Sequence, residues 1–381
     1  MPMRALLDFT QIPKDRTGVG VYAENLVKEL VHHFKAPDIL FLLVQKDEQR
    51  IRQIVKGCSN VVIISLPTTL FRNRALLLFF EQLIMPFLLM RRQIDVVHSL
   101  HYTHPLFSPC SRVVTIHDLT HLLFPELHTT GRRLVMAFFG RHAVRHAEGV
   151  LFISNATCVD AEKLIPTVNE NFRRVVPHGV DPQEFQISRE LTKKVLDGLS
   201  ITKPFLLFIG TLEPRKNIVR LIQAFERVAG EFPDFILVIA GKPGWGFDEI
   251  FTAMRTGEHR NRIRYLGFVT EVEKKALLSE CEELIYPSLY EGFGLPVLEA
   301  MAMGSPVITS NISSLPEVTG EAAVLIDPFS VDDMTAAIRD MANSATRRRE
   351  LSALGKQRAS TFSWEKTAKQ TFDLYKVVAK D

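Results

Sequence analysis

The stretch of sequence that decides the fold is Tyr286-Pro-Ser-Leu-Tyr-Glu-Gly-Phe-Gly-Leu-Pro-Val-Leu-Glu-Ala-Met-Ala-Met-Gly304. A strand is expected over Glu283–Pro287, and a turn with two glycines follows it. A helix is then expected from Pro296, because proline suits the first position of a helix. Strand, tight turn and helix in this order are typical of one βα unit of a parallel sheet.

The same alternation continues on both sides of this stretch. Further strands of the second half are expected at Phe205–Ile209, Phe235–Ala240, Ile263–Leu266, Pro306–Thr309 and Ala323–Ile326. Helices are expected at 217–232, Glu271–Cys281, Pro296–Met303 and Val331–Met341. Alternating strands and helices predict a doubly wound domain, in which ligands bind at the carboxyl ends of the strands.

The first half of the chain has the same pattern. Its strands are expected at Arg4–Phe9, Ile39–Val44, Val61–Ser65, Asp95–His98, Arg112–Ile116 and Val150–Ile153. Helices are expected from the loop with Gly18 and Gly20 to Phe34, and over Asp47–Val55, Ala75–Arg92 and Arg132–His146. A length of 381 residues also favours two domains. The sequence therefore predicts an α/β protein with two Rossmann-like domains facing each other across a cleft.

The two domains are expected to meet near Pro177–Pro182, where two prolines and a glycine break regular structure. This places residues 1–180 in the first domain and residues 181–361 in the second. Residues 362–381 are expected to form a C-terminal helix.

The turn before Pro296 carries groups suited to a nucleotide sugar. The backbone N–H groups of Gly294 and Leu295 would face an anion at the start of the helix, and a diphosphate fits such a site. Glu299 can accept hydrogen bonds from two neighbouring ribose hydroxyls, and Glu291 can do the same for a sugar. The alternative is an ordinary turn and amphipathic helix with one exposed glutamate.

A basic loop, Gly210-Thr-Leu-Glu-Pro-Arg-Lys-Asn217, follows the strand at Phe205–Ile209. Arg215 can hold phosphate oxygens with two hydrogen bonds, and Lys216 can do so as a point charge. Together they can neutralise a diphosphate leaving group as its charge develops. The alternative is a solvated basic loop.

The first half contributes two weaker signals. His117 ends the apolar run Val113–Ile116, which places it at the carboxyl end of a strand; a structural histidine that caps the strand is the alternative. Gly18 and Gly20 form a Gly-x-Gly pattern, which allows the backbone to approach a phosphate or a sugar closely.

These segments resemble the family 4 retaining glycosyltransferases, which have the GT-B fold, and within that family the bacterial mannosyltransferases. The resemblance rests on the quoted 286–304 stretch and the basic loop, with Pro306–Ser310 and Leu315–Val318, and it extends through Thr17–Gly20, His117-Asp118 and Ser154–Ala156. It implies that residues 1–180 bind the acceptor and residues 181–361 the nucleotide sugar, and that the final helix crosses back to the first domain.

The resemblance also implies an activity. Mannose would pass from GDP-mannose to a hydroxyl of a glycan or lipid-linked glycan in polysaccharide biosynthesis, with retention of configuration and without a protein nucleophile. The expected catalytic residues are His117, Glu291, Lys216 and Arg215. The expected donor-binding residues are Gly18, Gly20, Thr211, Gly292, Phe293, Gly294, Leu295 and Glu299. Thr211 stands where many members carry an arginine.

Three alternatives stay open at this point. The donor can be a UDP-sugar instead of GDP-mannose. A nucleotide-sugar 2-epimerase shares the two-domain architecture but uses no acceptor, and a non-catalytic subunit would only bind the nucleotide sugar. The intact set of His117, Lys216, Glu291 and Glu299 argues against the last of these.

Composition limits the partners. The net charge of +3 is too small to indicate nucleic acid, but residues 1–180 hold 21 Lys and Arg against 15 Asp and Glu. This basic half, with the candidate amphipathic segment around Arg132 and Arg133, leaves a peripheral contact at the inner face of the membrane open. The sequence contains no obvious metal-binding motif, so no metal or other cofactor is expected. Without a secretory signal or paired cysteines, a cytoplasmic protein is expected.

Overall fold

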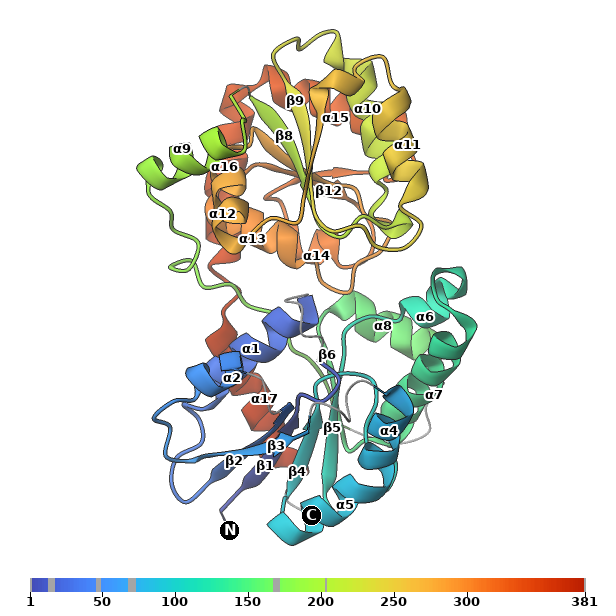
Figure 1. The fold of residues 1–381 in the computed structure, drawn as a ribbon, viewed down its shortest axis with the longest axis vertical. Coiled ribbons are helices and arrows are strands. Elements are labelled where there is room, and N and C mark those ends of the chain that lie inside the picture. Colours follow the sequence, from blue (N-terminus) through green and yellow to red (C-terminus); the bar gives the residue numbers. More distant parts are fainter. Residues whose placement is uncertain are drawn as a thin grey trace. The chain divides into compact units, whose positions relative to one another are not determined.

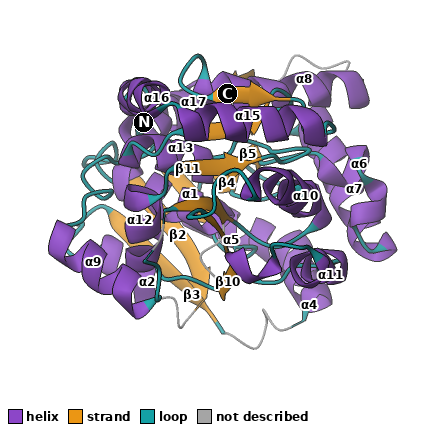
Figure 2. Cartoon of the chain, turned by 90° about the horizontal axis from the view of Figure 1, so that it is seen from above, coloured by secondary structure: helices purple, strands orange, loops and turns teal. Residues whose placement is uncertain are grey.

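The computed structural model describes residues 2–12, 18–45, 49–67, 73–166, 172–202 and 204–379. The chain forms two compact units (Figure 1). Unit 1 comprises Met1–Gly179 and Ser363–Asp381, and unit 2 comprises Val180–Phe362. Each unit is a parallel sheet flanked by helices, and Figure 2 distinguishes these strands and helices by colour. Among the described residues, no helix is both long and apolar enough to cross a membrane.

Unit 1 has a seven-stranded sheet in the order β3-β2-β1-β4-β5-β6-β7. Its strands are β1 (Arg4–Asp8), β2 (Ile39–Gln45), β3 (Val61–Leu66), β4 (Val96–Ser99), β5 (Ser111–Ile116), β6 (Gly149–Phe152) and β7 (Phe172–Val175). Its helices are α1 (Gly18–Leu30), α2 (Gln49–Ile54), α4 (Arg74–Phe79), η1 (Phe80–Ile84), α5 (Met85–Arg92), α6 (Thr120–Leu123), η2 (Pro125–Leu127), α7 (Thr130–His146), α8 (Asn155–Leu164) and α17 (Trp364–Val378).

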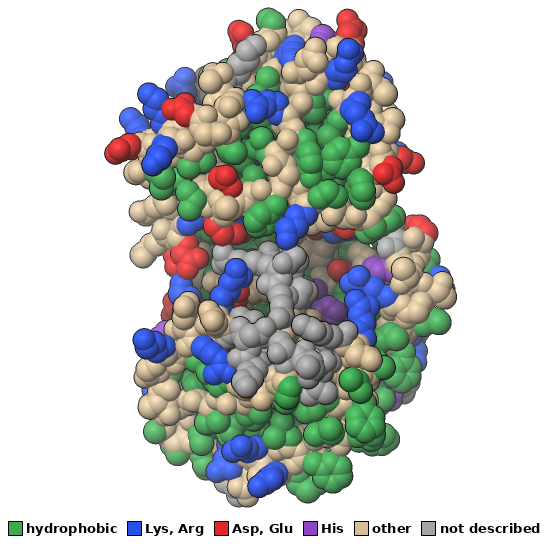
Figure 3. Space-filling model, in the orientation of Figure 1, with side chains coloured by type: hydrophobic (Ala, Val, Ile, Leu, Met, Phe, Trp, Pro, Cys, Tyr) green, Lys and Arg blue, Asp and Glu red, His purple; other side chains and the backbone are tan. Residues whose placement is uncertain are grey.

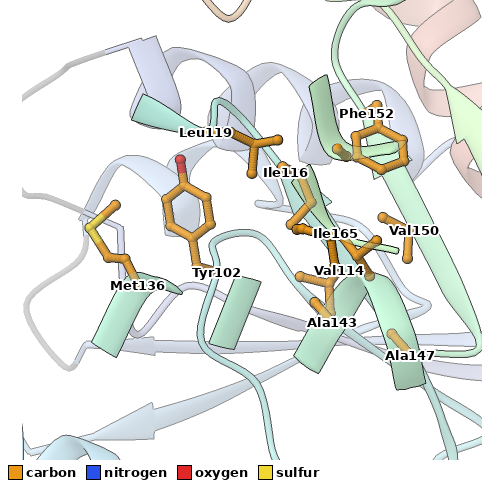
Figure 4. Packing of buried hydrophobic residues seen from close by; sticks show 12 residues of the cluster. Tyr102, Val114, Ile116, Leu119, Met136, Ala143, Ala147, Val150, Phe152 and Ile165 are labelled. Atoms are coloured by element: carbon orange, nitrogen blue, oxygen red, sulfur yellow. The ribbon is translucent and has the colours of Figure 1, made fainter. Parts of the chain in front are cut away.

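Apolar side chains on both faces of this sheet explain why its strands read as nearly continuous apolar runs. On one face, Figure 4 shows Val114 and Ile116 of β5 packed with Phe152 of β6 and Ala143 of α7. The helices α4, η1 and α5 cover β1, β2 and β4 on this face through Phe80, Met85 and Leu89. Because helices cover the faces of the sheet, its polar ligand-binding residues are expected at the carboxyl ends of the strands.

The segment expected as one helix over Ala75–Arg92 is interrupted. Phe80–Ile84 forms a π-helix, in which the N–H of Met85 donates to the carbonyl of Phe80. The cause is Pro86, which has no N–H to donate and whose ring crowds the carbonyl four residues earlier. The wider turn places Glu81, which is fully buried, inside unit 1.

The C-terminal helix α17 packs in unit 1 against α1 and β6. Ser363 caps its first turn by accepting from the N–H of Lys366. Tyr375 lies 2.5 Å from Nδ1 of His98 on β4, and the hydroxyl of Thr367 donates to the carbonyl of Pro177 at 2.7 Å. A Cβ on Gly179 would lie only 2.1 Å from the nitrogen of Trp364, so this crossing of two chain segments requires glycine.

Unit 2 has a six-stranded sheet in the order β10-β9-β8-β11-β12-β13. Its strands are β8 (Phe205–Ile209), β9 (Ile236–Ala240), β10 (Ile263–Gly267), β11 (Glu283–Tyr286), β12 (Val307–Ser310) and β13 (Val324–Ile326). Its helices are α9 (Arg189–Gly198), η3 (Pro214–Lys216), α10 (Ile218–Ala229), α11 (Asp248–Thr256), η4 (Arg260–Arg262), α12 (Glu271–Glu280), α13 (Leu295–Met303), α14 (Leu315–Thr319), α15 (Val331–Asn343) and α16 (Ala345–Ala359).

The expected strands and helices appear with small shifts at their ends. The sequence patterns did not predict β7 or the helices α6, α8, α9, α11, α14 and α16. In α16 nine of the fifteen residues are polar and the only large apolar residues are Leu351 and Leu354, so apolar periodicity gives little signal for a helix. One expectation about a glycine segment was wrong, since Gly18 and Gly20 lie in the first turn of α1 and not in a loop before it. Thr17 lies outside the described residues.

Candidate functional site

The main site lies in unit 2, where the strand order reverses. The chain builds β8, β9 and β10 toward one edge and then β11, β12 and β13 toward the other, so β8 and β11 are neighbours at the switch. The loops that leave the carboxyl ends of two such strands diverge and leave room for a ligand. These two loops carry Arg215 and Lys216 after β8, and Glu291 to Gly294 after β11. The fold therefore brings together the two segments that the sequence analysis singled out.

Glu291 lies between the two basic residues of the β8 loop. Its Oε1 accepts from Nζ of Lys216 at 2.6 Å, and its Oε2 lies 3.0 Å from Nη1 of Arg215. Nζ of Lys216 also donates to the hydroxyl of Tyr286 at 2.5 Å. Lys216 and Glu291 are buried, so this ion pair is sheltered from water.

Arg215 contacts protein groups through each nitrogen of its guanidinium. Nε and Nη2 donate to Oε1 of Glu213, at 3.1 and 2.6 Å, and Nη1 donates to the carbonyl of Tyr290. The carbonyl of Arg215 in turn accepts from the N–H of Leu289 at 2.8 Å. Arg215 thus joins the two loops, which makes it a positioning residue for Glu291 in this structure.

The charges of this cluster keep Glu291 ionised. Burial alone would raise the pKa of Glu291, but the neighbouring charges of Arg215 and Lys216 outweigh it and hold the pKa at about 2. Burial, together with the charge of Arg215, lowers the pKa of Lys216 below its ordinary value. A carboxylate has about four acceptor positions, so Glu291 can accept from a hydroxyl while it binds both cations.

The glycine turn sets the start of α13. Gly294 is the N-cap with φ of +108°, and α13 begins at Leu295, one residue before the expected Pro296. The hydroxyl of Ser314 donates to the carbonyls of Glu291 and Phe293, at 2.9 and 2.8 Å. Ser314 thus holds a turn in which Phe293 and Gly294 are buried and Gly292 is half-buried.

The second glutamate, Glu299, lies one turn further along α13 and is buried. Its Oε1 accepts from Nζ of Lys274 on α12 at 3.0 Å, and the same Nζ lies 3.1 Å from Glu271. Glu299 thus pairs with Lys274, which is a different cation from the two that contact Glu291. Sequence reasoning missed Lys274 and Ser314, because no local pattern shows that Lys274 reaches Glu299 or that Ser314 holds the turn before α13.

The remaining predicted donor-binding residue of unit 2 is Thr211, which is the second residue after the end of β8. It is exposed, and a Cβ on Gly244 would lie 2.8 Å from its Cγ2. The side chain therefore lies next to the loop that follows β9.

Three of the predicted site residues, His117, Gly18 and Gly20, lie in unit 1. His117 directly follows β5 and is buried, and its Nε2 donates to the carbonyl of Leu100 at 2.9 Å. The neutral ring thus carries its proton on Nε2 and keeps a lone pair on Nδ1. Burial lowers the pKa of His117, which favours this neutral form. Gly18 and Gly20 offer backbone N–H groups at the start of α1.

No three His, Cys, Asp or Glu side chains come together as a metal site anywhere in the described ranges. The chemistry that the described side chains of unit 2 can perform is recognition of an anion beside a polyhydroxylated group. That a metal is not required stays a prediction.

Comparison with known proteins agrees with this chemistry. Residues 16–184 match the family described as Glycosyltransferase Family 4, and residues 194–358 match the one described as Glycosyl transferases group 1. The chain is 34% identical to O-antigen chain mannosyltransferase B of Escherichia coli over 70% of each chain. It is 29% identical to the serotype-specific mannosyltransferase WbdA of Escherichia coli over 71% of this chain, which spans only 34% of that longer protein.

Solved structures show the same fold at low identity. Anabaena Alr3699/HepE, solved in complex with UDP-glucose, has a TM-score of 0.77 at 16% identity and covers 98% of this chain and 100% of its own. WaaG, a glycosyltransferase involved in lipopolysaccharide biosynthesis, has a TM-score of 0.74 at 15% identity and covers 100% of both chains. The fold is therefore GT-B, with two Rossmann-like domains. The chain is a glycosyltransferase and belongs to glycosyltransferase family 4.

Proposed function

We propose that this glycosyltransferase transfers mannose from GDP-mannose to a hydroxyl of a glycan or lipid-linked glycan, with retention of configuration. The observation that carries the proposal is the buried pair of Lys216 and Glu291, with the half-buried Arg215, beside the start of α13. Relatives named as mannosyltransferases support mannose as the sugar. The name of the O-antigen relative supports a growing surface polysaccharide as the acceptor.

The proposed donor lies along the carboxyl ends of β8 and β11. Its diphosphate accepts from the N–H groups at Gly294 and Leu295, where the dipole of α13 favours negative charge. Lys216 adds a positive charge to the leaving phosphate. Glu291, which its two cations keep ionised, accepts from hydroxyls of the sugar, and Glu299 accepts from the ribose hydroxyls.

The proposed reaction is a front-face displacement. The bond between the anomeric carbon and the phosphate oxygen breaks, and a bond from the acceptor oxygen forms on the same face. The acceptor proton passes to the departing phosphate oxygen, so GDP leaves and no protein nucleophile takes part. The contribution of unit 2 is electrostatic, because its cation and backbone dipoles are in place before the phosphate charge develops.

The test of this proposal is a thermal-shift series with GDP, UDP, ADP and their common sugar conjugates. GDP and GDP-mannose should raise the Tm selectively. Glu299→Gln should weaken GDP binding by about 10-fold or more, since it removes an ionised acceptor for ribose. Glu271→Gln is the matched control, because Glu271 also contacts Lys274 but is exposed. Stabilisation by UDP species instead would exclude GDP-mannose as the donor, and no response to any nucleotide would contradict the proposal as a whole.

We also propose that unit 1 contacts the membrane surface. Six large apolar side chains are exposed along α4, η1 and α5: Leu76, Phe79, Leu83, Ile84, Phe87 and Met90. Figure 3 shows apolar side chains gathered on this part of unit 1, with Lys and Arg beside them. Arg91 and Arg92 in the last turn of α5 add positive charge, which suits anionic lipid.

Phe87→Asp should lower binding to vesicles that contain phosphatidylglycerol by about 10-fold or more, because burying one phenyl ring in lipid contributes about 1.5–3 kcal/mol. Phe87 is 70% exposed, so the substitution should leave the fold intact. Phe268→Asp in unit 2, where the ring is 65% exposed, is the control for a general loss of hydrophobic surface. Co-sedimentation measures both, and equal binding of the two variants would contradict a role for this face.

A further inference from the structure

Unit 1 has its own topological switch, which the proposed donor site does not use. The chain builds β1, β2 and β3 toward one edge and then β4 to β7 toward the other, so β1 and β4 are neighbours. Asp8 is the last residue of β1 and Ser99 the last of β4, and the two are direct partners in the sheet. This is the position at which open parallel sheets bind ligands.

Three polar side chains end neighbouring strands on one face of the sheet here. Leu6 of β1, Leu43 of β2 and Val97 of β4 belong to one apolar cluster under α5. Side chains alternate between the faces of a strand, so the residue two positions later lies on the same face. Those residues are Asp8, Gln45 and Ser99, and each of them is buried.

Glu81 reaches this face from the π-helix η1. It is fully buried, and its Oε2 accepts from the hydroxyl of Thr103 at 2.8 Å and from Nε2 of Gln11 at 3.1 Å. Its Oε1 accepts from Nε2 of Gln82 at 3.0 Å. Asp8 raises the pKa of Glu81 through its charge, although burial is the larger cause, so the two carboxyl groups share one environment.

Two atoms of this group have no hydrogen-bond partner within the part of the chain that the structure describes. They are Oγ of Ser99 and Oε1 of Gln45, in side chains that are 2% and 9% exposed. A buried polar atom left without a partner costs about 1–3 kcal/mol. Atoms of this kind at a ligand-binding position of the fold indicate a bound group that supplies the missing hydrogen bonds.

The chemistry of the group favours hydroxyls over a cation. Burial raises the pKa of Asp8 to about 6 and that of Glu81 to about 8, so near neutral pH the pair offers both an acceptor and an acidic proton. A sugar hydroxyl both donates and accepts, which matches such a pair. Among the described residues this group has two carboxylates, and no three His, Cys, Asp or Glu side chains come together there to hold a metal ion.

We propose that Asp8, Glu81, Ser99 and Gln45 bind neighbouring hydroxyl groups of the acceptor sugar at the β1–β4 switch of unit 1. The inference rests on the proposed function in one respect, since it identifies the bound sugar as the acceptor of that transfer. The residues bind and orient the sugar and take no part in bond breaking.

Saturation-transfer difference NMR on the full chain tests this site. The probes are the methyl glycosides of mannose, glucose, galactose and N-acetylglucosamine, with excess GDP present to occupy the donor site. At least one glycoside should receive saturation from the wild-type protein. Its signal should fall at least fivefold with Ser99→Ala and with Asp8→Asn. Ser99→Ala is the decisive variant, because its hydroxyl makes no hydrogen bond among the described residues and its loss should leave the fold intact.

Thr371→Ala is the matched control, since it also removes a buried hydroxyl of unit 1, one that donates within its own helix, to the carbonyl of Thr367. It should leave the glycoside signal unchanged. No signal from any glycoside, or an equal signal from Ser99→Ala and wild type, would overturn the proposal. So would a rise in Tm with MgCl₂ or CaCl₂ that Asp8→Asn abolishes, which would assign the site to a cation. A thermal shift with GDP on the same samples shows separately whether the proposed donor is wrong.

Discussion

Replacing Glu291 with glutamine is expected to lower kcat/KM for transfer by roughly 10²–10³-fold. The carboxylate accepts from Lys216 at 2.6 Å and lies 3.0 Å from Arg215, and in the proposed complex it also accepts from the sugar. Glutamine keeps the shape but loses the charge that balances the buried Lys216 and the half-buried Arg215. Steady-state transfer with GDP-mannose, or with the donor that the thermal-shift series selects, measures the loss.

Two measurements separate catalysis from stability in this variant. Breaking a buried ion pair can destabilise a protein by about 3–5 kcal/mol, so the Tm must be recorded with the rate. GDP should still stabilise Glu291→Gln, because Glu291 is placed at the sugar and Glu299 at the nucleotide. Glu231→Gln is the control for removing one ion pair of unit 2, since its pair with Arg339 is on the surface. Turnover of Glu291→Gln within about threefold of wild type would remove Glu291 from the mechanism.

The pH dependence of stability gives an independent check on the same residue. The pKa of Glu291 is held at about 2 in the folded protein, below the ordinary value of 4.5. The group therefore stabilises the fold fully above about pH 4.5, and this stabilisation is lost as the pH falls toward 2. The difference in stability between wild type and Glu291→Gln should shrink over that range.

Replacing Gly294 with alanine is expected to damage both the fold and donor binding. Gly294 has φ of +108°, where a side chain is strained, and an added Cβ would lie 2.8 Å from Cδ2 of Leu315. The strain alone should lower the free energy of unfolding by about 1–3 kcal/mol, which corresponds to a fall in Tm of several degrees for a unit of this size. Affinity for GDP should fall by about 10-fold or more, because the N–H groups that start α13 would move.

Gly230→Ala is the matched control for this substitution. Gly230 ends α10 with φ of −63°, and a Cβ there would meet nothing within 4 Å. Alanine at this position should leave the Tm unchanged or raise it slightly, since it restricts the unfolded chain. Thermal unfolding and a GDP titration compare the two variants. Equal behaviour of Gly294→Ala and Gly230→Ala would show that the turn does not shape the donor site.

Much of the fold could be read from local sequence. Buried parallel strands are short apolar runs, and β8, Phe205–Ile209, has the ends that the sequence predicts. Elements without such a signal were missed, such as α16, whose stability comes from packing on α13 and not from an apolar pattern. The π-helix at Phe80–Ile84 was also not predicted, although the sequence contains Pro86. A proline can kink, end or widen a helix, and the surrounding packing selects among these outcomes.

The sequence by itself determined which residue types the donor site of unit 2 would use, since Glu291, Gly294 and Glu299 lie within one short strand-turn-helix segment. Only the tertiary structure decided their partners. Lys274 holds Glu299 across 25 residues of chain, and Arg215 joins Glu291 across 76. The acidic group of Asp8 and Glu81 depends entirely on the fold, because strand order and a π-turn bring its members together. Sequence patterns report local geometry, whereas the order of strands in a sheet is set by packing between distant segments.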